Sequence, residues 1–195
     1  MADESVLSRV WALLLGYALV FIMFIGSNTG VFTDLLTHRA DPFLMMLFYL
    51  VFIFTISFII LIWHTEENPN LKRKLGLGAS LFFGAFALMP VFEEHGQDIV
   101  RKSPLMRAVI IINVIAATGL IIWGLFFGSF SHFLELWLED SFLHIMTVDF
   151  ITLYIFSIWV AKNYSKYWTV AFIPVIGFYL FLYIEFNQYL NERNA

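Results

Sequence analysis

Residues Gly26–Leu44 read GSNTGVFTDLLTHRADPFL, and residues Gly124–Leu143 read GLFFGSFSHFLELWLEDSFL. Both stretches open with G-x-x-x-G, reach an aspartate, and resume an apolar run with Phe-Leu two residues later. The two copies stand in opposite halves of the chain, and Gly84 and Gly177 follow at comparable places further on. This order of glycines and aspartates predicts an internal duplication, and coincidence between two hairpins of similar composition is the alternative.

The composition is that of a membrane protein. The chain has 195 residues, of which 61% are hydrophobic and 13% charged, and its mean hydropathy is +0.82. A soluble domain carries about 25% charged residues. The net charge of −4 makes nucleic acid an unexpected partner. The chain has no cysteine, which excludes disulfides, thiol catalysis and cysteine metal sites.

Six apolar runs are long enough to cross a membrane as helices, since a span needs about 20 residues. Their length without polar alternation excludes the strands of a membrane barrel. The predicted fold class is therefore an all-α, polytopic membrane protein with six transmembrane helices. The runs are Val10–Ser27, Pro42–Trp63, Leu75–Phe92, Ala108–Phe127, Ser141–Ala161 and Tyr167–Ile184.

The duplication divides the chain into two three-helix repeats, 1–95 and 105–195, joined by a linker over 96–104. Because three is odd, the second unit would begin on the opposite side of the membrane, which predicts an inverted repeat. The paired glycines are expected at close helix–helix contacts, since small residues let backbones approach in lipid. The residues concerned are Gly26, Gly30, Gly124 and Gly128.

A short amphipathic segment follows each glycine pair. In the second, an apolar face (Phe130, Phe133, Leu134, Trp137) repeats with helical spacing, while His132, Glu135 and Glu139 lie off it. Such helices are expected to lie in the membrane interface. A re-entrant element lining a pathway is the alternative.

The positive-inside rule gives no orientation for six spans. The amino-terminal side would carry Arg9, Lys72, Arg73, Lys74 and Arg193, and the other side Arg39, Arg101, Lys102, Arg107, Lys162 and Lys166. Taken separately, each half places most of its basic residues on the side where it starts. Either the halves are an inverted pair with weak preference, which we favour, or one run does not span. The third run, with Pro90 near its end, is the first candidate for that exception.

Asp149 is the main candidate inside the membrane. It lies about nine residues into its run, roughly 13 Å deep at 1.5 Å per residue. An intramembrane carboxylate is costly and is a functional hypothesis by default. The structural interpretation, which we favour, is a polar lock or a hydrogen bond to a neighbour such as Thr152. Leu50 is its counterpart in the first repeat, and His144 and Asn113 are the other polar candidates.

Four further histidines, His38, His64, His95 and His132, are weak candidates for a metal or haem site. Two histidines on neighbouring helices could ligate haem, and histidine with carboxylates could hold a metal. No H-x-x-x-H or H-E-x-x-H occurs, so interfacial histidines are the favoured interpretation and haem is not expected. The 23 phenylalanines predict a lipid-facing surface. The alternative is a surface that binds a lipid, a carotenoid or a chlorophyll-like pigment.

The segment TVDFITLYIFSIWVAKNYSKYWTVAFIPVIGFYLFLYIEFNQYLNER (Thr147–Arg193) resembles an uncharacterised family of small three-helix membrane proteins of cyanobacteria and plastids. The shared features are an early Asp (Asp149), a basic turn followed by Trp (Lys162–Trp168), and a closing helix with Gly177 and a Glu-Arg tail (Glu192, Arg193). The first half lacks the Asp. The resemblance implies a photosynthetic membrane and no particular activity.

Three functions remain open. An accessory or assembly subunit that packs against a larger membrane complex or a lipid-like cofactor is favoured by aromatic faces and few buried polar groups. A small inverted-repeat transporter with Asp149 in its pathway is the alternative, and an enzyme acting on a lipid or isoprenoid is the third. No catalytic residue is proposed. The expected partners are membrane lipids and other membrane proteins, in a bacterial inner membrane or a thylakoid membrane.

Overall fold

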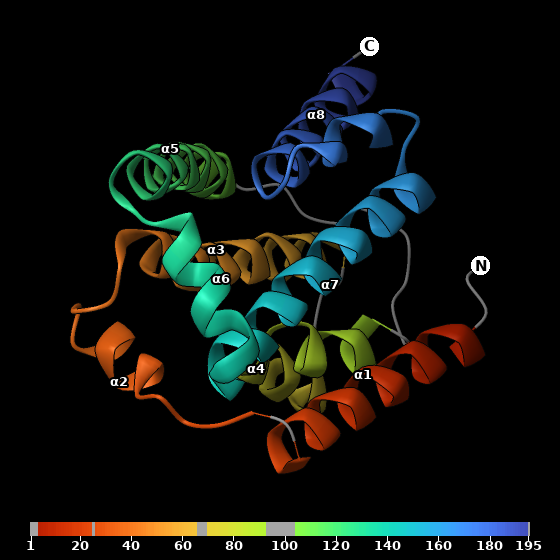
Figure 1. Cartoon of the computed structure of the whole chain (residues 1–195). Helices are drawn as coiled ribbons and strands as arrows, with labels where there is room; N and C mark the ends of the chain where they lie inside the picture. The colour runs from red at the N-terminus through yellow and green to blue at the C-terminus, as the bar shows by residue number, and fades with distance from the viewer. Residues whose placement is uncertain (1–3, 25, 66–69, 93–103, 195) are drawn as a thin grey trace.

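The computed structural model describes residues 4–24, 26–65, 70–92 and 104–194, and every regular element in these ranges is a helix. Figure 1 shows the helices as one bundle. The elements of the first half are α1 (Glu4–Phe24), α2 (Val31–Leu36), α3 (Pro42–Thr65) and α4 (Leu71–Phe92). Those of the second half are α5 (Pro104–Phe127), α6 (Phe130–Glu139), α7 (Ser141–Tyr164), the 3-10 helix η1 (Trp168–Phe172) and α8 (Ile176–Asn194).

Helices long and apolar enough to cross a membrane are present, as the composition predicts. By length and composition, α1, α3, α4, α5 and α7 qualify among the described residues, whereas the apolar part of α8 is shorter, Ile176–Asn187. The expectation of an all-helical chain with several helices that could span a membrane is confirmed. The expectation of six spans is not, because the third and sixth runs are both broken.

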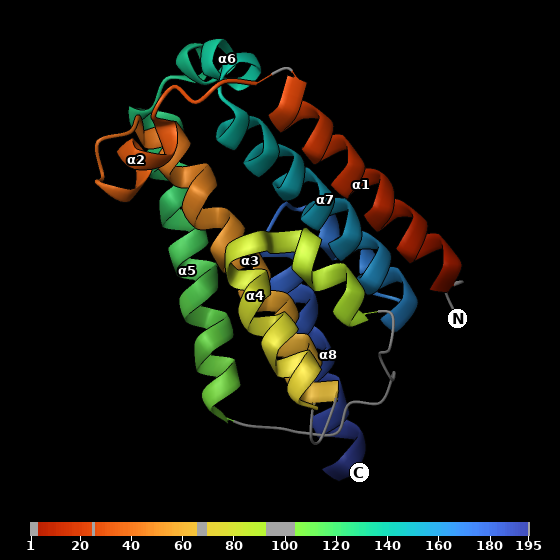
Figure 2. The ribbon, with the colours of Figure 1, turned by 90° about the horizontal axis from the view of Figure 1, so that it is seen from below.

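The third run turns back on itself at Gly84 within α4. Gly84 has φ 49° and ψ −127°, a backbone conformation that residues other than glycine rarely adopt. A Cβ built on Gly76 would lie 2.5 Å from Cγ2 of Val91, although a straight helix would hold these residues roughly 22 Å apart. Figure 2 shows α4 rising along α3 and then folding back. Helix α4 is therefore a re-entrant helical hairpin.

The sixth run, which is the third run of the second half, is also broken. After α7 ends, η1 leads to Pro174 and to Val175, which has φ 61°. The hydroxyl of Tyr154, well inside α7, donates to the carbonyl of Phe172 at 2.7 Å, so the chain has returned along α7 before α8 begins. Helix α8 then starts at mid-height, where the Tyr179 hydroxyl donates to the carbonyl of Ile53 in the middle of α3.

The two halves run in the same direction. Ser27, after α1, accepts from Ser141 N at 2.8 Å, and Asp41, before α3, accepts from Ser129 N, after α5. The ends of α1 and α5 and the starts of α3 and α7 thus share one end of the bundle, here called the α2–α6 end. The opposite end, with the starts of α1, α4 and α5, is called the N-terminal end. The inverted repeat is not confirmed, because the third run of each half reverses and returns the chain to the side where it started.

The predicted halves, 1–95 and 105–195, are packed against each other. Helix α3 contacts α5, α7 and α8, and α4 contacts α7. The predicted linker 96–104 lies outside the described residues except for the backbone of Pro104. Many phenylalanines serve this packing: Phe58 meets Phe178 with ring centroids 4.6 Å apart, and Phe92 and Phe156 complete the cluster. Some of the phenylalanine side chains therefore pack in the protein core and do not face lipid.

Candidate functional site

Asp149 lies in the interior of the bundle, at the break in α4. Its side chain is buried, and its Oδ1 accepts from the backbone N–H of Ala85 at 2.7 Å. Ala85 is the first residue after the break, so a carboxyl group from α7 caps the second segment of α4. The expected neighbour Thr152 is not the partner, since its hydroxyl donates to the carbonyl of Val148 in its own helix.

The contact at Gly84 is close enough to exclude a side chain. A Cβ built there would lie 1.7 Å from Oδ2 of Asp149. Glycine is required twice over, once by its positive φ and once by the carboxyl group facing it. Asp149 is the one residue with a carboxyl group at this depth of α7, and Leu50 stands at the matching place in α3.

A groove of about 610 Å³ leads from Asp149 toward the α2–α6 end. Its walls come from α1, α2, α3, both segments of α4 and α7, together with the segment after α1. Most of its lining is apolar and aromatic: Ile22, Phe32, Phe48, Val51, Phe52, Leu81, Phe82, Phe83, Phe86, Phe142, Ile145 and Met146. The polar lining is confined to its two ends, with Asp149 at the inner end and Ser27, Asn28, Asp140 and Ser141 at the mouth.

The repeated aspartates hold the mouth together. Asp140 caps α7 through Leu143 N at 2.9 Å and also accepts from the amide and the hydroxyl of Thr29 at 3.0 and 2.8 Å. Asp41 does the same in the other half, because it accepts from Phe43 N at 2.8 Å and from Ser129 N at 3.0 Å. Each aspartate therefore caps the helix that follows it and binds the segment beside the glycines of the other copy.

His144 packs next to this mouth and joins three helices. Its ring stacks on Phe21 of α1 at 3.7 Å and on Trp137 of α6 at 4.7 Å between centroids. Its Nδ1 lies 3.0 Å from the carbonyl oxygen of Trp137. A carbonyl only accepts, so in the neutral ring Nδ1 carries the hydrogen and Nε2 accepts from the hydroxyl of Tyr17. This arrangement fixes the ring between α1, α6 and α7.

Three of the four repeat glycines lie at contacts between elements. A Cβ on Gly124 would lie 2.5 Å from Met46, and one on Gly128 would lie 2.3 Å from the backbone of Phe43, both in α3. A Cβ on Gly26 would lie 2.1 Å from the hydroxyl oxygen of Ser141. Gly30 differs from the expectation: it has open space around it, and its φ of 89° at the start of α2 is what requires glycine.

The remaining polar candidates lie apart from Asp149. Asn113 is half-buried in α5 and donates to the carbonyl of Val109 in the same helix at 2.8 Å. His38 Nδ1 lies 2.9 Å from the hydroxyl of Tyr49 at the α2–α6 end. His95 is outside the described residues, and the structure does not describe the side chain of His64.

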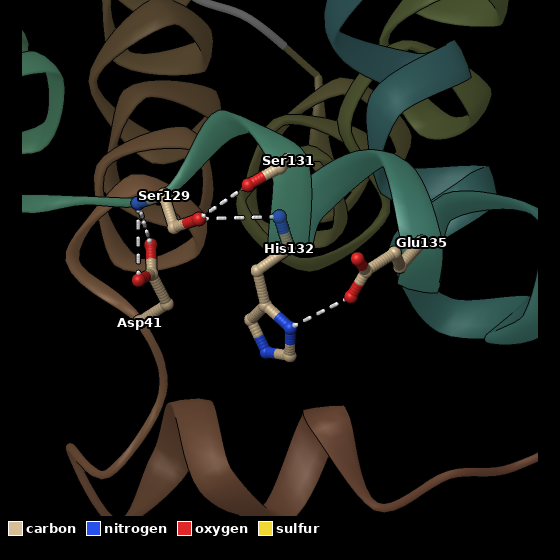
Figure 3. Close-up of polar contacts among 5 residues, drawn as sticks. All are labelled: Asp41, Ser129, Ser131, His132 and Glu135. Atoms are coloured by element: carbon tan, nitrogen blue, oxygen red, sulfur yellow. Dashed lines mark hydrogen bonds and ion pairs between the residues drawn. The ribbon is translucent and has the colours of Figure 1, made fainter.

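His132 belongs to the first turn of α6, as Figure 3 shows. Ser129 begins this turn: its N–H donates to Asp41 and its hydroxyl oxygen accepts from the N–H of His132 at 3.2 Å. The His132 ring faces Glu135, with Nδ1 and Oε2 3.8 Å apart, and both side chains are exposed. Within the described ranges, no three His, Asp or Glu side chains are grouped as a metal site requires.

A second, smaller groove of about 400 Å³ lies on the other side of this region. It runs between α1, the second segment of α4 and α7, and is lined by Leu7, Leu14, Met89, Phe156 and Trp159 among others. It has no carboxyl group in its lining, so the groove that ends at Asp149 is the better candidate for a specific ligand.

Comparison with known proteins gives no relative for this chain: no protein-family model, no curated protein and no solved structure matches it. The site must therefore be interpreted from its own geometry. The sequence pointed to Asp149 and to the repeated aspartates, but it did not identify Gly84 as the partner of Asp149 or Tyr17 as the partner of His144. The signals for the breaks were Gly84 in the third run and Pro174 in the sixth, since both residue types interrupt helices.

Proposed function

We propose that the protein is an accessory subunit of the membrane that holds one lipid-like molecule in the groove ending at Asp149. The observation that carries this proposal is the form of the groove: an apolar, aromatic body of about 610 Å³ with polar groups only at its ends. Binding sites for small apolar molecules have this form, with a few polar groups that fix orientation. A flat or chain-like molecule, such as a carotenoid, a chlorophyll-like pigment or a single lipid, matches such a lining.

The groove is open to the surrounding lipid. Phe82 and Phe83, which line it from α4, are 80% and 65% exposed in the isolated chain. A ligand could therefore enter sideways from the membrane. The wall formed by α4 depends on the break at Gly84, which links the shape of the groove to the contact between Asp149 and Ala85.

A groove-filling variant tests this proposal. Ile145 lines the groove from α7, whereas Ile115 of α5 is 67% exposed and lines neither groove. Ile145→Trp should reduce the amount of lipid-like molecule that copurifies per protein, while Ile115→Trp should not. The bound molecules are extracted from each purified variant and measured by mass spectrometry. Equal loading of both variants and the parent protein contradicts the proposal.

A small transporter is the second candidate, and one observation favours it. Transporter binding sites commonly lie near the midplane, where broken helices leave half-helix ends. Here α4 is broken at Gly84, and α8 begins at mid-height, directly after the break at Pro174 and Val175. Asp149 faces one of these breaks and lines the groove. If Asp149 relays protons, Asp149→Asn should abolish proton flux into reconstituted vesicles while the protein stays folded. Equal flux in vesicles with and without the parent protein contradicts this candidate.

This proposal includes three further parts. The protein associates with a larger membrane complex, it lies in a thylakoid or bacterial inner membrane, and its chain arose by an internal duplication. The duplication we now propose is a parallel one, with both copies starting at the N-terminal end. It is supported by the matching order of elements, by the two broken third runs, and by the reciprocal bonds of Asp41 and Asp140. An enzyme acting on a lipid or isoprenoid is not favoured by any contact in the groove.

A further inference from the structure

The distribution of charge between the two ends of the bundle is strongly asymmetric. Among residues with described side chains, one basic residue, Arg39, lies at the α2–α6 end. The acidic residues Asp34, Asp41, Glu135, Glu139 and Asp140 lie at that same end. Of the basic residues with described side chains, seven lie at the N-terminal end: Arg9, Lys72, Arg73, Lys74, Arg107, Lys162 and Lys166.

This asymmetry gives an orientation that six spans could not give. Loops rich in Lys and Arg stay on the cytoplasmic side of a membrane, and Asp and Glu contribute little to the rule. The third run of each half turns back, so the basic residues in the described part of both halves fall mostly on one side, seven against one. The N-terminal end is therefore cytoplasmic, and the mouth of the groove faces the opposite leaflet.

The mouth also indicates the charge of the molecule that it admits. Among the described residues that line the groove, none is Lys or Arg, and the charged group at the mouth is the carboxylate of Asp140. The start of α7 would otherwise attract an anion, because the first N–H groups of a helix are unpaired and carry partial positive charge. Asp140 already occupies that position through Leu143 N, and Ser141 N is bonded to Ser27 O.

The groups at the mouth suit hydroxyl or carbonyl groups. Asn28 is exposed there, and its Oδ1 accepts from Gly30 N at 3.0 Å, so its side-chain nitrogen is the donor that it presents. The hydroxyl groups of Ser27 and Ser141 line the same rim. An anionic headgroup would meet the Asp140 carboxylate without a cation to balance either charge.

We infer that the groove takes a lipid-like molecule with an uncharged, hydroxyl-bearing polar end from the leaflet opposite the cytoplasm. The inference rests on the proposed ligand-binding function, and it adds the leaflet and the headgroup class. The apolar part of the molecule lies along the phenylalanines of α3 and α4, and the polar end lies at Asn28 and the two serines.

The leaflet is tested by labelling single cysteines. The chain has no cysteine of its own, so Asn28→Cys and Lys166→Cys each introduce one reactive site at an exposed position. In intact cells, a membrane-impermeant maleimide should label Asn28→Cys and should label Lys166→Cys only after the cells are permeabilised. The reverse pattern overturns the assigned leaflet and leaves ligand binding untouched.

The headgroup class is tested in vesicles of phosphatidylcholine with equal amounts of galactosyl diacylglycerol and phosphatidylglycerol. In the protein recovered from these vesicles, the ratio of galactolipid to phosphatidylglycerol should be about tenfold higher than in the vesicles themselves. Asn28→Lys, which places a cation at the mouth, should shift this ratio toward phosphatidylglycerol. Ser131→Lys is the control, because Ser131 is exposed at the same end but does not line the groove.

Three results separate the claims. Preference for phosphatidylglycerol in the parent protein overturns the headgroup class while the binding function stands. Equal effects of Asn28→Lys and Ser131→Lys overturn the assignment of the polar end to this mouth. If the parent protein and Ile145→Trp both carry the two lipids in the same ratio as the vesicles, the binding function itself is contradicted.

Discussion

Asp149 of α7 caps a half-helix that belongs to α4: its Oδ1 accepts from the N–H of Ala85 at 2.7 Å, one residue after the break at Gly84. A free N–H at a helix start inside hydrocarbon has no water to bind, so the bond removes a cost of several kcal/mol. The relationship joins three features: the reversal of α4, the inner end of the groove, and the one acidic side chain at this depth of α7.

Replacement of Asp149 should separate its structural role from a chemical one. Asp149→Asn keeps an oxygen that can accept from Ala85, so the thermal stability of the purified protein in detergent should change little. Asp149→Leu leaves the amide unpaired and should lower stability by about 1–3 kcal/mol. Loss of proton flux in Asp149→Asn with unchanged stability would instead support the transporter candidate.

Gly84→Ala should destabilise the protein because it adds a methyl group against the carboxyl group at a positive φ. A non-glycine residue in such a conformation costs about 1–3 kcal/mol before the steric contact is counted. Gly78→Ala is the matched control in the same helix, with open space around it, and should be neutral or slightly stabilising. Equal melting temperatures of the two variants would contradict the assigned break.

The fold shows where the sequence was informative and where it was not. Length and hydropathy predicted the helices, and the repeated glycines and aspartates predicted that Gly26–Leu44 and Gly124–Leu143 have matching roles. Hydropathy cannot separate a straight span from a hairpin of two short helices, because both are apolar throughout. Gly84 decides between them through its φ and through a contact with Asp149, 65 positions further on, and no local pattern reveals such a contact.

Because hydropathy does not reveal the hairpins, the sequence alone also gave no orientation in the membrane. Counted for six spans, the basic residues divided nearly evenly between the two sides. The even division was itself a sign that one assumption failed, since each half separately placed its charges on its starting side. Pro90 drew attention to the third run, whereas the reversal occurs at Gly84 and has a counterpart in the sixth run at Pro174 and Val175.

Asp140 should contribute more to stability than an acidic residue that is only nearby. Asp140→Ala removes the cap of α7 and the acceptor for Thr29, so we expect a loss of about 1–3 kcal/mol. Asp34→Ala is the control, because Asp34 is exposed in α2 at the same end. Thermal unfolding in detergent measures both, and an equal shift would show that the bonds across the halves add little.

Gly124→Leu should destabilise the contact between α5 and α3. The new side chain would overlap Met46, and overpacking of this kind costs about 1–3 kcal/mol. Gly119→Leu, at an earlier position in α5 with open space around the glycine, is the control and should leave the melting temperature unchanged. A similar loss in both variants would indicate that glycine serves the helix itself rather than the contact.

The claim that the groove holds a specific molecule is tested most directly by photocrosslinking in the native membrane. A benzoylphenylalanine introduced at Phe83 faces the groove, and one introduced at Phe126 of α5, which is 81% exposed and lines neither groove, faces bulk lipid. Irradiation followed by mass spectrometry should give one dominant lipid-like adduct at Phe83 and a mixture in the proportions of the membrane at Phe126. The same mixture at both positions would contradict the account.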